Sequence, residues 1–194
     1  MDTNNNSKIF TLTKLALSVS IMCILGPIII PLPFSPIPIS ITQIGLYLSI
    51  YFLGYKLATY CTIIYILMGL IGLPVFSGYS GGLQKLTSPT GGYLMGFIFL
   101  TFISGIFIEK YTNNLYLTIL GYTLGNLLCY SLGSIWLSYS TNISIKTAFI
   151  IGVIPYIFTD ILKVIVSIVI GTRLRRNALK SLWTEDYNVK NRKN

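Results

Sequence analysis

The stretch GLPVFSGYSGGLQKLTSPTGGYLMGF, residues 72–97, lies between two apolar runs and is rich in glycine. Proteins use glycine where the backbone turns sharply or approaches a ligand closely. A loop of about 17 residues inside a compact protein is usually either functional or disordered. Leu73, Val75 and Phe76 are apolar, which argues against a solvated linker. The stretch therefore predicts an ordered loop that closes over something.

The composition of the chain is that of an integral membrane protein. Of its 194 residues, 53% are apolar and 10% are charged, which is too few charges to cover a soluble globule of this size. There is no histidine, and the three cysteines lie singly in apolar runs, so no metal, cofactor or disulfide framework is expected. The net charge of +9 comes mainly from chain ends and hinges, so we expect no nucleic-acid partner.

Six apolar segments predict an all-α integral membrane protein with six transmembrane helices. The segments are 9–30, 39–55, 57–73, 91–109, 115–139 and 147–171. The second and third are near the short limit, because 17 residues of helix reach about 26 Å and a hydrocarbon core is about 30 Å thick. The predicted units are an N-terminal tail (1–8), a membrane domain (9–171) and a basic C-terminal tail (172–194).

The basic residues predict the orientation in the membrane. With a cytoplasmic amino terminus, 11 of the 14 Lys and Arg residues lie inside, Lys85 and Lys146 lie outside, and Lys163 lies within the last span. Basic residues accumulate on the cytoplasmic side of membrane proteins. We therefore expect a multi-pass protein of the cell membrane, surrounded by lipid, with both termini in the cytoplasm. The glycine-rich loop is then external, together with PLPFSPIPIS, residues 31–40, whose four prolines favour an extended hairpin.

Asp160 is the only acidic residue in the interior of a predicted span, since Glu109 lies at the end of one, and Lys163 follows Asp160 three residues later. This spacing places both side chains on one face of a helix. Each charge at mid-membrane costs about 2.5 to 3.5 kcal/mol, so the pair indicates a functional site. The alternative is an ion pair that only lets the helix insert. Pro155, about a turn upstream, is expected to break or kink the helix.

Other residues allow two interpretations each. Gln43 is either a wall of a binding site or a helix–helix contact, and Ala16 with Ser20 forms either a docking surface or an internal packing seam. No phosphate-binding loop, nucleophile elbow or second carboxylate accompanies Asp160, so no catalytic residue and no ATP site are expected. A binding or transport protein is favoured, and a small membrane enzyme or assembly subunit is the alternative.

Four motifs together resemble the BioY family, the biotin-specific substrate-binding (S) subunits of energy-coupling factor (ECF) transporters. They are GLIGLPVFSGYSGGLQKLTSPTGGYLMGF, PIPISITQIG, GNLLCYSLGSIWLS and TDILKVIVSIVIG, and the resemblance extends over most of residues 14–171. It implies six helices, a biotin pocket that opens outward, and a lid formed by the loop between helices three and four. The glycines assigned to this lid are Gly78, Gly81, Gly82, Gly91 and Gly92.

The resemblance also implies how biotin is held. Asp160 and Lys163 match the ligand-binding Asp and Lys of the family; Asp160 would accept hydrogen bonds from the ureido N–H groups while Lys163 offsets its charge. Lys85 is a candidate partner for the biotin carboxylate, with an exposed interfacial lysine as the alternative. Aromatic walls for the apolar part of biotin are expected from Phe76, Tyr79 and Tyr93.

The energy for uptake is expected to come from partners. In the family, two ATPase subunits and a coupling transmembrane subunit supply it, and Ala16 and Ser20 would then form the docking surface. An S subunit for another vitamin is the nearest alternative within transport.

Overall fold

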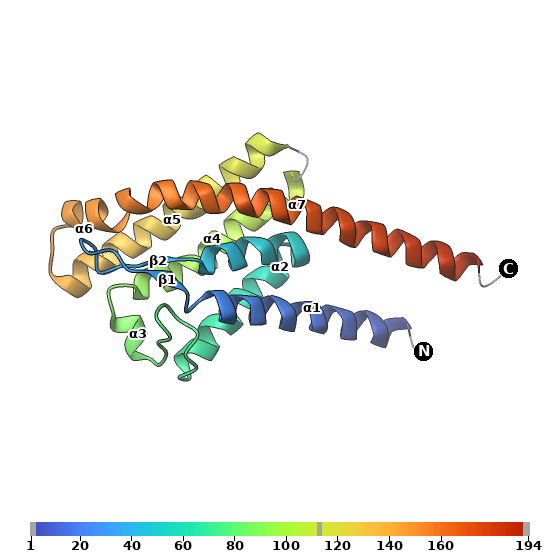
Figure 1. Cartoon of the computed structure of the whole chain (residues 1–194), viewed down its shortest axis with the longest axis horizontal. Coiled ribbons are helices and arrows are strands. Elements are labelled where there is room, and N and C mark those ends of the chain that lie inside the picture. The colour runs from blue at the N-terminus through green and yellow to red at the C-terminus, as the bar shows by residue number, and fades with distance from the viewer. Residues whose placement is uncertain (1–2, 112–113, 192–194) are drawn as a thin grey trace.

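The computed structural model describes residues 3–111 and 114–191, which are mostly helical (Figure 1). The elements in chain order are α1 (Thr3–Leu25), β1 (Ile29–Ile30), β2 (Ile39–Ser40), α2 (Thr42–Leu70), α3 (Gln84–Thr87), α4 (Gly91–Tyr111), α5 (Leu115–Thr141), α6 (Ile145–Gly152) and α7 (Ile154–Asn191). The all-α membrane fold predicted from the apolar segments is confirmed.

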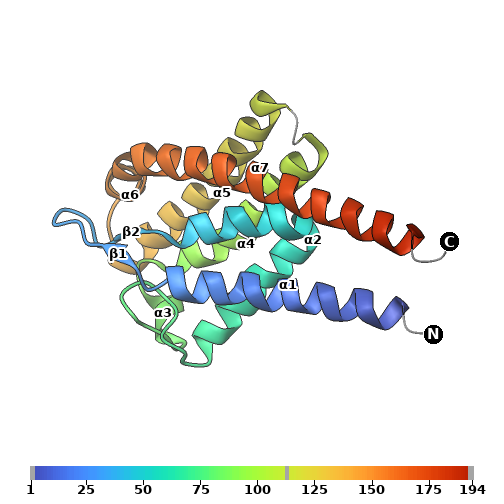
Figure 2. The ribbon, with the colours of Figure 1, turned by 45° about the vertical axis from the view of Figure 1, so that its right-hand side comes forward.

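The helix α2 contains a chain reversal at Gly54. This residue has φ of 76° and ψ of 172°, so α2 consists of two helical halves, 42–53 and 55–70. The positive φ disfavours any other residue at Gly54, and a Cβ atom there would lie 2.5 Å from Oε2 of Glu109, which would have to move. The same oxygen accepts a hydrogen bond of 2.8 Å from the backbone N–H of Tyr55 and caps the second half. Figures 1 and 2 show α2 running toward the end with the termini and then turning back.

The reversal explains the six crossings. The described helices that are long and apolar enough to cross a membrane are Thr42–Leu70, Gly91–Tyr111, Leu115–Thr141 and the segment Ile145–Arg173, and Ile9–Leu25 is a shorter apolar helix. Because Gly54 divides the first of these, the chain crosses as α1, the two halves of α2, α4, α5 and finally α6 with α7. The predicted spans 39–55 and 57–73 correspond to the two halves of α2.

The last crossing is broken as Pro155 predicts. The break lies at Val153, with φ of −126° and ψ of −55°, between α6 and α7. Pro155 is the second residue of α7. An N–H group in the first turn of a helix has no acceptor within the helix, so proline costs no helical hydrogen bond there. The helix then continues to Asn191, so the predicted tail 172–194 is helical over its described part. Residues 1–2 of the predicted N-terminal tail and residues 192–194 lie outside the described residues.

The two ends of the bundle differ. The start of α1 and the end of α7 lie at one end, whereas the β1–β2 hairpin, α3 and the glycine-rich loop lie at the other (Figures 1 and 2). In the hairpin, Ile29 pairs with Ser40 and Ile30 with Ile39 in antiparallel register, which confirms the predicted hairpin around residues 31–40. The first and the last described helix therefore begin and end, respectively, on the same side of the bundle.

Tyrosines fill much of the core, and apolar side chains cover the outside. The rings of Tyr47 and Tyr122 meet edge to face with centroids 4.5 Å apart, and the Tyr47 hydroxyl donates a hydrogen bond of 3.0 Å to Asn126. On the outer surface, Ile135 and Phe158 are 61% and 78% exposed. Large apolar side chains exposed along spanning helices face lipid, so the chain is a multi-pass membrane protein.

Candidate functional site

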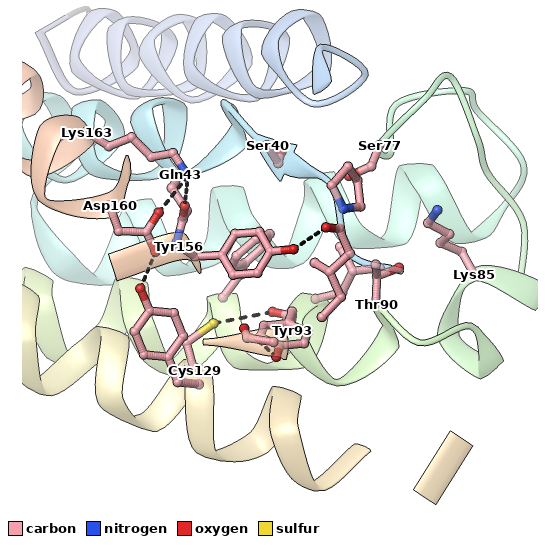
Figure 3. A pocket seen from close by; sticks show the side chains of 16 residues that line it. Ser40, Gln43, Ser77, Lys85, Thr90, Tyr93, Cys129, Tyr156, Asp160 and Lys163 are labelled. Atoms are coloured by element: carbon pink, nitrogen blue, oxygen red, sulfur yellow. Dashed lines mark hydrogen bonds and ion pairs between the residues drawn. The ribbon is translucent and has the colours of Figure 1, made fainter. Parts of the chain in front are cut away.

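A pocket opens between the hairpin, the glycine-rich loop and the helices α2, α4, α5 and α7 (Figure 3). Its lining combines apolar, aromatic and charged side chains from segments that are far apart in the sequence. The lining residues are Ile37, Pro38, Ser40, Gln43, Ser77, Lys85, Thr90, Tyr93, Leu94, Phe97, Cys129, Tyr130, Gly152, Tyr156, Asp160 and Lys163. Such a lining suits a small ligand that carries polar groups on an apolar body.

Three of the predicted residues, Gln43, Asp160 and Lys163, form a closed polar triad. The Lys163 ammonium lies 2.7 Å from Oδ1 of Asp160 and donates a hydrogen bond of 2.5 Å to Oε1 of Gln43. The Gln43 amide nitrogen donates a bond of 3.2 Å to Oδ2 of Asp160. The three side chains belong to residues that are 5–7% exposed, so the pair of charges is held away from solvent.

Tyr130 is a fourth member of the site that the sequence did not single out. Its hydroxyl donates a hydrogen bond to Oδ2 of Asp160, and its ring lines the pocket. The signal that points to it is the helical spacing of small and polar residues on α5: Asn126, Gly133 and Ser134 are buried, and Tyr130 lies on the same stripe. The chain has 14 tyrosines, so residue type alone does not distinguish this one.

The triad keeps unused hydrogen-bonding capacity. An ammonium has three N–H donors and Lys163 uses two of them, while the Gln43 amide uses one of its two. The Asp160 carboxylate has about four acceptor positions, and Lys163, Gln43 and Tyr130 occupy three. The site can therefore donate to a ligand carbonyl and accept from a ligand N–H at the same time.

Lys85 lies at the opposite side of the pocket. Figure 3 shows Lys85, Ser77 and Thr90 apart from the triad, with Tyr156 and Tyr93 between them. Lys85 is half-buried in α3, and this burial lowers its pKa below the ordinary lysine value. An anionic ligand group beside Lys85 would favour its charged form. The pocket thus has a polar group at each side and an apolar middle.

Two tyrosines join the pocket walls to the broken last crossing. The Tyr93 hydroxyl donates a hydrogen bond of 2.9 Å to the carbonyl of Gly152, the last residue of α6. The Tyr156 hydroxyl donates to the carbonyl of Ile37 and lies 2.8 Å from the hydroxyl of Ser35. These contacts fix the hairpin against the start of α7, so the hairpin forms one wall of the pocket.

Two predicted aromatic walls lie elsewhere. Tyr79 is 73% exposed and lies outside the pocket lining, with φ of 57°. Phe76, itself part of the glycine-rich loop, is fully buried, and its ring meets that of Tyr65 edge to face at 5.6 Å between centroids. The apolar walls come instead from Leu94 and Phe97 of α4. Residue type suggested an aromatic contact, but the loop geometry decides which rings reach the pocket.

The predicted lid glycines separate into two groups. Gly78, Gly81 and Gly82 lie in the loop, whereas Gly91 and Gly92 are the first residues of α4. A Cβ atom at Gly92 would lie 2.3 Å from Cβ of Trp136 in α5. Gly92 therefore allows α4 and α5 to pack closely. The prediction that Gly91 and Gly92 lie in a loop over the ligand was wrong, because both residues belong to α4.

The glycine-rich loop is bound to the bundle at several points. The Tyr65 hydroxyl donates a hydrogen bond of 2.9 Å to the carbonyl of Val75, and the indole N–H of Trp136 donates one of 2.9 Å to the carbonyl of Ser88. The N–H of Gly78 donates a bond of 3.1 Å to the carbonyl of Pro27 beside the hairpin. The loop is thus ordered, and it covers the same end of the bundle as the hairpin.

Ala16 and Ser20 lie on the outer face of α1. Both are exposed, and the Ser20 hydroxyl donates a hydrogen bond of 2.9 Å to the carbonyl of Ala16 within the same helix. The internal packing seam of α1 is formed by Ser18, Val19 and Met22, which are buried. Of the two interpretations of Ala16 and Ser20, the exposed positions favour a docking surface.

Within residues 3–111 and 114–191 there is no group of three or more His, Cys, Asp or Glu side chains that could hold a metal ion. The cysteines Cys23, Cys61 and Cys129 are free. Cys129 lines the pocket, where its thiol lies 3.7 Å from the carbonyl of Tyr93.

Several known proteins are similar to this chain in sequence and in fold. The chain matches the BioY family over residues 1–180. It is 35% identical over 147 residues to the biotin transporter BioY of Thermotoga maritima, covering 76% of this chain and 86% of that protein. It is 32% identical over 176 residues to the biotin transporter BioY2 of Lactococcus lactis, covering 88% and 93%. The crystal structure of an S-component for biotin from an ECF-type ABC transporter matches with a TM-score of 0.82 and 33% identity, covering 89% of this chain and 94% of that one.

Proposed function

Because the chain belongs to the BioY family, we propose that it is the biotin-binding membrane subunit of a vitamin uptake transporter. The observation that carries the proposal is the triad of Gln43, Asp160 and Lys163 in a pocket at the hairpin end of the bundle. The subunit captures biotin at this end and releases it at the end with the termini. It is a transport protein and not an enzyme.

The arrangement of the pocket suits biotin in one orientation. The ureido ring offers two N–H donors and one carbonyl, which complement the acceptors of Asp160 and the free N–H groups of Lys163 and Gln43. The apolar bicycle and chain then pass Leu94 and Phe97, and the terminal carboxylate reaches Lys85. The partial burial of Lys85 strengthens its attraction to an anion.

A titration with biotin analogues tests this function. Desthiobiotin keeps the cyclic urea and the carboxylate, whereas lipoic acid keeps only an apolar chain and the carboxylate. We expect the purified protein to bind biotin and desthiobiotin and to bind lipoic acid at least about a hundredfold more weakly, because the triad loses its partners. Tight binding of thiamine or riboflavin with no binding of biotin would instead assign the subunit to another vitamin.

The energy for release comes from partners. We place the hairpin end outside the cell membrane and both termini in the cytoplasm, where most basic residues lie. A coupling transmembrane subunit docks on Ala16 and Ser20, which are small and exposed on α1, and two ATPase subunits drive it. Lipid covers the remaining outer surface.

Bulky substitutions on α1 separate docking from binding. We expect Ala16→Leu and Ser20→Leu to leave biotin binding by the isolated subunit unchanged and to abolish ATP-driven uptake in cells that contain the partners. Thr123→Leu is the matched control, because Thr123 is exposed on α5 and its hydroxyl bonds to its own helix as that of Ser20 does. Loss of biotin binding in the α1 variants would show that the two residues pack internally.

A further inference from the structure

A groove on the outside of the bundle, between α1 and the first half of α2, is separate from the biotin pocket. Leu17 at its rim is 51% exposed, so the groove is open to the surroundings. Three of its lining residues, Ser18, Gly45 and Ser49, have small side chains that leave the space empty. The other lining residues are apolar, namely Leu17, Ile21, Leu48 and Phe52.

Lys14 lies at the end of this groove nearest the termini. It precedes Leu17, Ser18 and Ile21 by three, four and seven residues, so it lies on the same face of α1. Its Cα is about 10 Å along the helix axis from that of Ile21. The Lys14 ammonium lies 4.2 Å from the centroid of the Phe10 ring, one turn closer to the start of α1, so the side chain extends toward that end.

Among the residues whose side chains the structure describes, no carboxylate pairs with Lys14. The residue lies within the apolar segment Ile9–Leu25, and neither of the carboxylates whose side chains the structure describes, Glu109 and Asp160, forms an ion pair with it. A lysine within an apolar helix extends its ammonium to the level of the lipid headgroups. The negative groups at that level are phosphates. The Lys14 ammonium can therefore pair with a lipid phosphate.

We propose that the groove binds one acyl chain of an anionic phospholipid, with the lipid phosphate held by Lys14. The apolar walls match a hydrocarbon chain, and the small residues of the floor allow it to lie close to both helix backbones. This site goes beyond the proposed transport function. It lies directly beside the docking surface, because Ala16 and Ser20 immediately precede the groove residues Leu17 and Ile21 in the chain.

Native mass spectrometry of the full chain with added phosphatidylglycerol tests the proposal. We expect one lipid to be retained, Lys14→Gln to reduce the retained fraction about fivefold, and Ile21→Trp to remove it by filling the groove. Lys110→Gln and Leu12→Trp are the matched controls and should retain the lipid. Lys110 lies 5.3 Å from the Tyr111 ring and outside the groove lining, and Leu12 is 64% exposed on the face of α1 opposite Ile21.

Two results would overturn the proposal. One is equal retention of phosphatidylglycerol by Lys14→Gln and the parent protein, with unchanged thermal unfolding midpoints. The other is a dimer mass that Ile21→Trp abolishes, which would make the groove an interface between two copies. Biotin titration of the same samples is independent of the lipid result, so a failed lipid site would leave the proposed transport function standing.

Discussion

The ammonium of Lys163 donates a hydrogen bond of 2.5 Å to the side-chain oxygen of Gln43, a residue 120 positions earlier in the chain. The amide nitrogen of Gln43 donates in turn to Asp160 at 3.2 Å, so one amide bridges both members of an ion pair on α7. Gln43 lies in the first turn of α2, directly after the hairpin. The bridge therefore joins the hairpin side of the pocket to the ion pair of Asp160 and Lys163.

Replacing Gln43 tests this bridge. We expect Gln43→Leu to weaken biotin binding by about tenfold. The substitution removes the amide, which can contact biotin and which holds Asp160 and Lys163, while the ion pair between those two residues remains. Isothermal titration on folded protein in detergent measures the change. Gln84→Leu is the control, since Gln84 is exposed on α3 and lies outside the pocket lining. Unchanged affinity in the Gln43 variant would make this residue a helix–helix contact only.

Tyr130 should contribute through Asp160. Tyr130→Phe keeps the ring and removes the hydroxyl that donates to the carboxylate, so we expect an affinity loss of about fivefold, equivalent to about 1 kcal/mol. Tyr139→Phe, at a position that is 76% exposed, should bind as the parent does. If both variants retain the parent affinity for biotin, the hydroxyl of Tyr130 has no role in ligand binding.

Lys85 should make biotin binding dependent on pH. The Lys85 amine must be protonated to pair with the biotin carboxylate, so the affinity for biotin should fall as the pH rises and the amine loses its proton. Because burial lowers the Lys85 pKa, this fall should begin at a lower pH than it would for an exposed lysine. Biotin amide, which has no carboxylate, should show no such fall. We expect Lys85→Met to bind biotin more weakly and independently of pH, and exposed Lys146→Met to behave as the parent. Equal pH profiles for biotin and its amide would contradict this role.

The topology can be tested by reporter fusions. Lys56 follows the reversal at Gly54 and Lys110 lies in the last turn of α4, whereas Lys85 belongs to α3 and Lys146 to α6. Figure 1 shows α3 and α6 at the hairpin end of the bundle, opposite the end toward which the first half of α2 runs. We expect fusions after Lys56 and Lys110 to report cytoplasm and those after Lys85 and Lys146 to report the outside. Reporters with the opposite sidedness would place the pocket on the inner face and contradict capture from outside.

Periodicity and charge in the sequence were sufficient to predict the crossings and the central pair. The cost of a charge in an apolar helix singled out Asp160 and Lys163, and their spacing placed them on one face, as the ion pair at 2.7 Å confirms. The break before Asp160 followed from the fixed backbone of Pro155. Each of these inferences depends on local geometry, which a helix repeats regularly.

Contacts between distant segments were beyond such inference. The helical spacing on α5 places Tyr130 on the stripe of buried residues, but only the folded structure shows that its hydroxyl reaches Asp160, 30 residues later on α7. Gly92 was assigned to the lid because glycine indicates close approach, but the partner that approaches is Trp136 of a neighbouring helix. Tyr79 has a residue type suited to a pocket wall, but the backbone of its loop directs it outward.

The central claim is that Asp160 and Lys163 bind biotin and do more than neutralise each other. Asp160→Asn removes the anionic acceptor and leaves Lys163 without its ion pair, and Lys163→Met leaves the carboxylate without a cation. The loss of a charged hydrogen bond to the ligand, about 1.5 to 3 kcal/mol, predicts affinities weaker by about tenfold to a hundredfold.

Calorimetric titration of biotin into the parent protein, both single variants and the double variant decides the matter, with thermal unfolding as a check on folding. We predict that the double variant recovers the stability lost in the single variants, because no unpaired charge remains, but binds biotin no better than they do. A double variant that binds biotin with the parent affinity would contradict the account and leave the ion pair a purely structural role.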